Sequence, residues 1–324
     1  IGKQHYYTIQ GGKQLKKHLI SLMVLFLLVS TSCVGVSYPL TSLGSGNHAP
    51  IRIIGNDQFI EENGVTGGSG TVEDPYIIEG WIIIGNRSTE TGIYICNTTA
   101  AFIIRNCSIS NFSREDYIAI SLYNITGGRI EDVEAFNNYD GIQIEQSSNI
   151  YLENCTVHDN YGAVATGIMV LSSHHVTISD CACYRIRCSP SGQINACGIV
   201  LDCASNCTIK NSTCYLNSRN GIKMFGIGTK TENSLRYNVI ENCTVYKNNW
   251  HGIQLFMPYL YWYEIKDDVN RGYNRISDCV VYDNGHMPIP GTMNAGSGID
   301  LWNIDDTVVE NCMIYENGVG VSIY

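Results

Sequence analysis

The side chains best placed to do chemistry follow a short Gly-Ile phrase that recurs along the 324-residue chain. After Gly141, the alternation of a β-strand turns Gln143 and Glu145 outward. Counting from the other glycines of this phrase sorts the outward residues into two columns. The first column holds Tyr94, Gln143, Lys223, Gln254 and Asp300, and the second holds Glu145, Asp202, Phe225, Phe256 and Trp302.

The charged residues of these columns are the candidate catalytic groups. Cleavage of a glycosidic bond uses two carboxyl groups about 5–9.5 Å apart. Glu145 and Asp202 are expected two strands apart, about 9.6 Å at sheet spacing, which is the far edge of that range. Asp300 is expected three strands from Asp202, about 14 Å away, which is too far for direct partnership. Lys223 is expected one strand from Asp202, as an exposed ion pair of little energetic value.

Aromatic and polar residues around the same strands indicate a binding groove. Insertions before the strands (184–197 and 283–297) and after them (226–238 and 257–274) would stand as walls beside the strip, and the last is rich in aromatic residues. Polar groups between aromatic rings suit a glycan, and loops on a rigid scaffold are the usual place for a site. The predicted substrate-binding residues are Lys223, His251, Gln254, Tyr261, Trp262, Asp300 and Trp302.

A second repeated phrase predicts how these strands are stacked. It reads apolar, any, Asn or Asp, Cys, any, apolar, as in residues 152–157. Its third position holds residues that tolerate the left-handed conformation. The apolar positions on either side are an odd number of residues apart, so a bend is needed to turn both inward. The expected corner residues are Gly80, Asn106, Asp132, Asn154, Asp180, Asn211, Asn242, Asp278 and Asn311.

The copies recur every 22 to 36 residues, with the variation in loops. This pattern predicts an all-β solenoid, a parallel β-helix of roughly ten rungs with three short strands per rung. The repeats resemble those of right-handed, single-stranded parallel β-helix proteins of the NosD-like, carbohydrate-binding and sugar-hydrolase superfamily. The stretch from residue 51 to 81 resembles the opening module of archaeal cell-surface β-helix proteins. This resemblance implies an exported protein and leaves the activity open.

The ends of the chain suggest further divisions. Lysines precede an apolar run at 19–29 and then small residues, the order of a secretory signal. We therefore expect a signal peptide or N-terminal anchor over 1–37, a capping module over 38–75 and the β-helix over 76–324, truncated at its C-terminus. If uncleaved, residues 18–36 would be a membrane anchor.

Cysteine and aromatic columns have two interpretations each. Eight cysteines, beginning with Cys107, fall on inward positions, which predicts stacked free thiols. Cys188 and Cys197 could instead form a disulfide, and the states of Cys203 and Cys207 stay open. An outward column from Phe136 to Tyr315 predicts either lateral stacking of rings or a platform for sugars.

A net charge of −10 argues against a nucleic-acid partner. No cofactor or metal is predicted; calcium stays open as an alternative, although no motif supports it. The favoured function is that of a monomeric extracellular or cell-surface protein that binds a polysaccharide or a surface glycoprotein without catalysis. The alternative is a polysaccharide lyase, glycoside hydrolase or epimerase, with Glu145, Asp202, Lys223 and Asp300 as catalytic residues. A structural spacer is the third interpretation.

Overall fold

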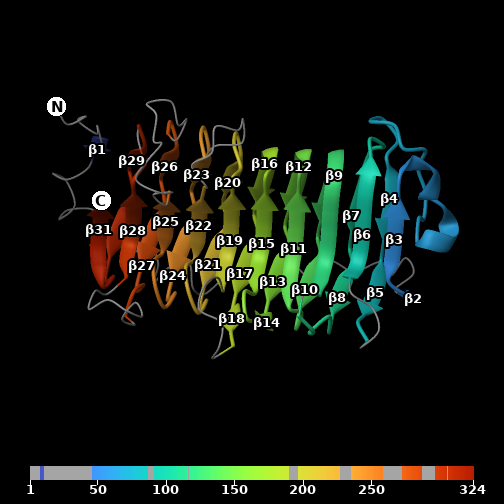
Figure 1. The fold of residues 1–324 in the computed structure, drawn as a ribbon, viewed down its shortest axis with the longest axis horizontal. Coiled ribbons are helices and arrows are strands. Elements are labelled where there is room, and N and C mark those ends of the chain that lie inside the picture. Colours follow the sequence, from blue (N-terminus) through green and yellow to red (C-terminus); the bar gives the residue numbers. More distant parts are fainter. Residues whose placement is uncertain are drawn as a thin grey trace, which may run out of the picture.

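The chain folds into a rod of stacked parallel strands (Figure 1). This computed structural model describes residues 8–10, 46–86, 91–115, 117–189, 196–226, 235–257, 272–286, 296–304 and 306–324. Within these ranges the strands pair in parallel, each with its equivalents one turn earlier and one turn later. The predicted parallel β-helix is therefore confirmed.

Each full turn contributes one strand to each of three faces, which we call the first, second and third sheets in chain order. The first sheet comprises β3 (Ile51–Ile54), β6 (Thr91–Thr98), the start of β9 (Ile118–Glu131), β11 (Asp140–Glu145), β15 (Thr166–Leu171), β19 (Cys197–Asp202), β22 (Ile222–Phe225), β25 (Ile253–Phe256), β28 (Ser297–Trp302) and β31 (Val319–Ile323).

The second sheet continues from the first through the long strand β9. It comprises β4 (Tyr76–Glu79), β7 (Phe102–Arg105), the end of β9, β12 (Ser148–Glu153), β16 (His174–Ser179), β20 (Thr208–Lys210), β23 (Val239–Glu241), β26 (Arg275–Ser277), β29 (Val308–Glu310) and β1 (Thr8–Gln10).

The third sheet follows the predicted corner. It comprises β2 (Gly46–Asn47), β5 (Trp81–Ile84), β8 (Ser108–Ser110), β10 (Glu134–Phe136), β13 (Thr156–His158), β17 (Ala182–Tyr184), β21 (Thr213–Tyr215), β24 (Thr244–Tyr246), β27 (Val280–Tyr282) and β30 (Met313–Tyr315). A small side pair, β14 (Tyr161–Gly162) and β18 (Arg187–Cys188), and two short 3-10 turns, η1 (Asn56–Gln58) and η2 (Glu61–Asn63), complete the described elements.

The predicted corner is confirmed at all nine positions. Every one of these residues has a positive φ, from 51° at Asn211 to 77° at Gly80. The corners also lie in register, because the Asn154 N–H donates to the Ser179 carbonyl at 3.2 Å and the Asp180 N–H donates to the Lys210 carbonyl at 3.1 Å. One recurring left-handed residue therefore aligns successive turns.

Three further corners use left-handed residues that we did not predict. Several are residue types with no preference for this conformation, such as Leu216 and Lys247. They are Asn97, Asn124, Gln146, Ser172, Cys203 and Asn303 after the first sheet, Asn149, His175, Asn206, Tyr237, Tyr273 and Asp306 near the start of the second, and Asn111, Asn137, Asp159, Arg185, Leu216, Lys247, Asp283 and Glu316 after the third.

The core consists of the inward columns. Leu152, Cys155 and Val157 are fully buried, as the bend requires. All thirteen cysteines in the described part of the chain are free, including Cys188 and Cys197. The stacked-thiol prediction is confirmed there, and these cysteines act as small apolar side chains.

A buried asparagine ladder, absent from our sequence analysis, runs beside the third sheet. The Asn248 side-chain oxygen accepts the Asn217 N–H at 3.1 Å, and the Asn284 oxygen accepts the Asn248 N–H at 3.0 Å. Both bonds join adjacent turns. The ladder therefore satisfies backbone groups where strand pairing ends.

The predicted leader and the domain boundaries lie only partly within the described residues. Most of the predicted leader lies outside them, although β1 pairs with β29 in parallel, with Thr8 opposite Val308. In the described part, no helix has the length and apolar character needed to cross a bilayer. The boundaries of the predicted leader, cap and β-helix domain stay predictions.

Candidate functional site

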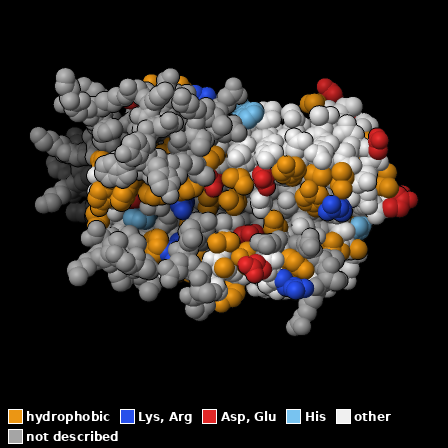
Figure 2. Space-filling view, viewed as in Figure 1, with side chains coloured by type: hydrophobic (Ala, Val, Ile, Leu, Met, Phe, Trp, Pro, Cys, Tyr) orange, Lys and Arg blue, Asp and Glu red, His pale blue; other side chains and the backbone are white. Residues whose placement is uncertain are grey.

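The outer face of the first sheet carries the two predicted columns. In the first column, Lys223, Gln254 and Asp300 lie opposite one another on β22, β25 and β28. In the second, Phe225, Phe256 and Trp302 do the same, with Asp202 one turn earlier. The column prediction is confirmed, and Figure 2 shows hydrophobic side chains following one another along the rod with a few charged groups beside them.

Two predicted site residues, Gln254 and Asp300, belong to one hydrogen-bond network, and two more, Lys223 and His251, lie beside it. The Asn220 amide donates to Gln254 Oε1 at 2.8 Å, and Gln254 Nε2 donates to Asp300 Oδ2 at 2.9 Å. Ser322 donates to Asp300 Oδ1. His251 Nε2 lies 3.9 Å from Asp300 Oδ2, and the electrostatic influence of Lys223 also reaches His251.

Burial separates these residues into two groups. Asp300 is 3% exposed and His251 is 6% exposed, whereas Lys223 and Gln254 are half-buried. The two buried groups hold the strands in place and position their neighbours. Direct contact of Asp300 and His251 with a ligand stays a prediction.

The proton on His251 is fixed by its neighbours. The Ser297 backbone N–H donates to His251 Nδ1 at 3.0 Å, so the neutral ring carries its proton on Nε2. Burial lowers the pKa of His251, which favours this neutral form. In this arrangement His251 can donate a hydrogen bond toward Asp300 but has no free nitrogen to act as a base.

Asp202 is the most unusual carboxylate of the face. Its Oδ1 is buried and has no hydrogen-bond partner among the described residues. Burial raises the pKa of Asp202, and this outweighs the opposing effects of the Cys203 thiol and the Lys223 ammonium. Such a carboxyl group holds a proton more readily than an exposed aspartate.

The other predicted carboxylates keep the spacing expected from the sequence. Glu145 lies opposite Leu171, which lies opposite Asp202, so the two acids are two turns apart. Glu145 is half-buried and accepts a hydrogen bond from Gln143 at 3.2 Å. Asp300 is three turns from Asp202.

A strip of four aromatic rings runs along the second column toward the C-terminal end. The rings of Phe225 and Phe256 are stacked with centroids 5.8 Å apart, and the Lys223 ammonium lies 5.0 Å from the Phe225 centroid. Trp302 departs from this stack, at 67° to Phe256 and 36° to Tyr324. The Trp302 side chain is 37% exposed. An aromatic ring turned out of a stack and open to solvent is suited to packing against a sugar.

The outward ladder on the third sheet has a different character. Its neighbouring ring centroids are 4.7–5.3 Å apart and the ring planes differ by 1–15°. The faces of the inner rings are therefore used by their neighbours and are closed to a sugar ring. The lateral-stacking interpretation is confirmed. The ladder consists of Phe136, His158, Tyr184, Tyr215, Tyr246, Tyr282 and Tyr315.

Most residues of the four loops predicted to wall the groove lie outside the described residues. Tyr261 and Trp262 lie outside the described residues, as does most of the aromatic loop that carries them. Among the residues that are described, no three His, Cys, Asp or Glu side chains gather where they could hold a metal ion.

Sequence reasoning missed three members of the network, namely Asn220, Ser297 and Ser322. A signal for them existed. Ser322 falls in the first column when counted from Gly320, and the strand register places it opposite Asp300. Asn220 and Ser297 each stand directly before the glycine of the Gly-Ile phrase, where Asp140 and Thr166 also stand.

Comparison with known proteins defines the class. The family model described as "Right handed beta helix region" matches residues 49–184, 91–255 and 161–324. These matches together span most of the chain, so the protein belongs to the right-handed β-helix family. No curated protein matches the sequence significantly.

Two kinds of solved structure share the fold. The periplasmic alginate epimerase AlgG is similar with a TM-score of 0.52 at 13% sequence identity, over 73% of this chain and 50% of that chain. The pectate lyase Pel9A is similar with a TM-score of 0.51 at 14% identity, over 85% of this chain and 68% of that one. This chain thus covers only half the length of AlgG. At such low identity the likeness concerns the fold alone.

Proposed function

We propose that this protein is exported to the cell surface and binds a polysaccharide or a surface glycoprotein along the outer face of its first sheet, without turning it over. The single observation that carries the proposal is Trp302. Its ring is exposed and turned out of the stack, and the terminal ring of the strip, Tyr324, lies beside it at 36° and is 61% exposed. Half-buried Lys223 and Gln254 lie in the neighbouring column and would hydrogen-bond sugar hydroxyl groups.

The polar network supports binding rather than turnover. Asp300 accepts two hydrogen bonds, and the Nδ1 atom of His251 accepts a third from the backbone. Hydrogen bonds within the protein already hold these groups in place, which favours a rigid recognition surface. The basic and apolar start of the chain supports export. The similar structures are an alginate epimerase and a pectate lyase, which supports a glycan as the ligand.

A glycan array, followed by calorimetry with the best-bound oligosaccharide, tests this proposal. Trp302→Ala should weaken binding about tenfold or more, because truncating a central aromatic anchor has effects of that size. Tyr246→Ala is the matched control, since Tyr246 lies between two stacked rings on the third sheet. Equal losses in both variants, or no binding by the wild type, would refute the proposed site.

Asp202 favours a second candidate function. Its unpartnered oxygen and raised pKa fit a general acid, and Lys223 on the next turn could serve as a base in a lyase or epimerase. A hydrolase would pair Asp202 with Glu145. Incubation with polyuronates and neutral polysaccharides tests this alternative. Product release that disappears in Asp202→Ala and in Lys223→Ala would establish it, while binding without product supports the first proposal.

A further inference from the structure

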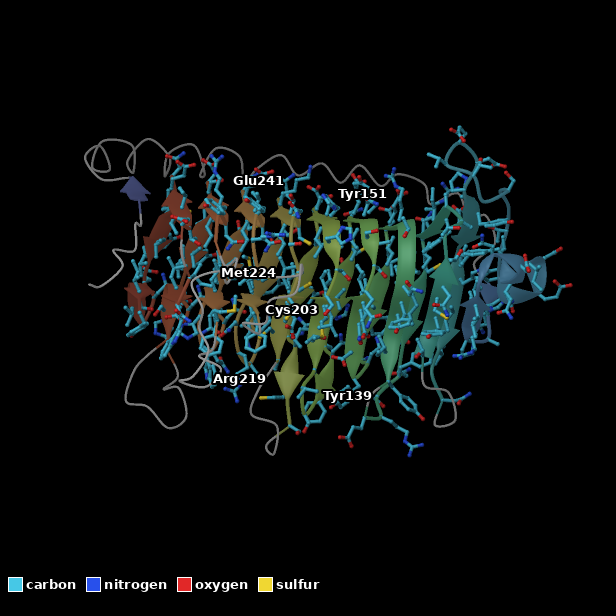
Figure 3. All side chains as sticks on the ribbon, turned by 45° about the horizontal axis from the view of Figure 1, so that its top comes forward. Tyr139, Tyr151, Cys203, Arg219, Met224 and Glu241 are labelled. Carbon is cyan, nitrogen blue, oxygen red and sulfur yellow. The ribbon has the colours of Figure 1, made fainter. Side chains whose placement is uncertain are left out.

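Arg219 is a buried cation for which the described residues supply no ionic partner. It lies three residues before β22 and is 5% exposed, and its Nη1 atom is buried without a hydrogen-bond partner. Throughout the described residues, no ion pair and no side-chain hydrogen bond involves its guanidinium. Figure 3 shows Arg219 toward the border of the stacked strands, away from Met224 of the core.

The position of Arg219 is fixed from both sides. Its N–H donates to the Ala196 carbonyl at 3.0 Å, and its own carbonyl accepts the Trp250 N–H at 3.1 Å. Its guanidinium carbon lies only 3.4 Å from the Trp250 ring centroid, so the indole covers one face of the group. All five N–H donors lie on the edge of the guanidinium, and among them those of the buried Nη1 have no hydrogen-bond partner in the described residues.

The surroundings explain why none of the described acidic residues neutralises this charge. Asp300, the buried carboxylate of the nearby network, already accepts hydrogen bonds from Gln254 and Ser322. Lys223 adds a second positive charge, since both cations act electrostatically on Cys197. A buried guanidinium without an anion is unfavourable, because desolvation of the charge is not compensated.

We infer that Arg219 recognises an anionic group, a carboxylate or a sulfate, on an acidic glycan bound at this face. The inference rests on the proposed function and adds the class of sugar. Two oxygens of the anion would receive two parallel N–H donors from the guanidinium edge, while Trp250 holds the plane of the group. Because the chain as a whole carries a net charge of −10, long-range attraction would not bring in such a ligand, and this local contact would provide the selectivity.

Matched pairs of probes test the inference. Oligogalacturonate is compared with its carboxyl-reduced, neutral form, and dextran sulfate with dextran, by calorimetry at two salt concentrations. The wild type should bind one acidic probe about tenfold or more tightly than its neutral partner. Preference in the first pair identifies a carboxylate, and preference in the second identifies a sulfate.

Two variants locate the effect. Arg219→Gln should abolish the preference for the acidic probe, and Arg219→Lys should retain only part of it, because an ammonium lacks the planar pair of donors. Arg187→Gln is the control, since it removes the same charge from an exposed residue one turn earlier. The urea midpoint of each variant shows whether the buried site still folds.

The outcomes separate this inference from the proposed function. If folded Arg219→Gln keeps the acidic preference while Trp302→Ala loses binding, the role of Arg219 is wrong and the glycan site stands. If the wild type binds acidic and neutral probes equally, the anionic class is wrong. If no glycan binds at all, the proposed function itself fails.

Discussion

Replacing one rung of the buried asparagine ladder should destabilise the β-helix strongly. Asn248 is 1% exposed. Its Oδ1 accepts both the backbone N–H of Asn217, at 3.1 Å, and the Asn217 side-chain amide, at 2.9 Å. Its Nδ2 donates to the Cys214 carbonyl at 3.1 Å and to Asn284 Oδ1 at 2.9 Å. Asn248→Ala removes these four bonds and a fifth, from Nδ2 to the Tyr246 carbonyl at 3.2 Å.

The size of the effect follows from the groups left behind. Two donors of Asn217, itself fully buried, lose their acceptor. Each unsatisfied buried group costs about 1–3 kcal/mol, so the free energy of unfolding should fall by about 4 kcal/mol. That loss is a large fraction of the stability of an ordinary domain.

Urea denaturation followed by tryptophan fluorescence measures the change, and hydrogen exchange locates it. Because each rung of a solenoid contacts mainly its neighbours, protection should fall first in β21, β24 and β27. The control is Asn249→Ala, which truncates the next residue of the chain, a half-buried asparagine, and should change stability by less than about 0.5 kcal/mol. Equal small effects in both variants would refute the ladder as a source of stability.

Two further predictions concern the titratable groups. All thirteen described cysteines should react with an alkylating agent in denaturant without reductant, and fewer than eight reactive thiols would contradict the stacked-thiol core. Burial raises the pKa of Asp202 above its ordinary value of 3.8, so its contribution to stability is fully present below that pH and is lost as pH rises through the raised value. Urea titrations at several pH values should therefore show Asp202→Asn gaining stability relative to the wild type as pH rises, and an unchanged difference from pH 3 to 7 would contradict the raised pKa.

Much of the architecture could be read from residue types because the chain repeats one turn many times. The asparagines and aspartates of the corner column recur at one place in each copy, and alternation from that place assigns every inward and outward position. Cys155, Cys181 and Cys243 could be assigned to the core in this way. Trp302 and Asp202 could be assigned to the outer face by the same count.

The residue types at the other three corners did not consistently indicate a left-handed conformation. Leu216, Lys247 and Glu316 adopt the left-handed conformation because the flanking strands and the asparagine ladder hold them there, and their side chains have no such preference. The asparagines of the ladder themselves were visible in the sequence. Their role was not, because a buried asparagine is recognised by its partners on the adjacent turns.

The sequence by itself determined the stacking of the turns and the face on which the charged and aromatic residues lie. The tertiary structure decided which of these side chains have hydrogen-bond partners within the protein. Asn220 and Gln254 are 34 residues apart and Gln254 and Asp300 are 46 apart, yet each pair forms a hydrogen bond across the stacked turns. Such contacts depend on side-chain orientation and burial between turns, and so does the absence of an ionic partner for Arg219 among the described residues. A periodic pattern fixes the register of the backbone, whereas the partner of a polar side chain depends on distances in three dimensions.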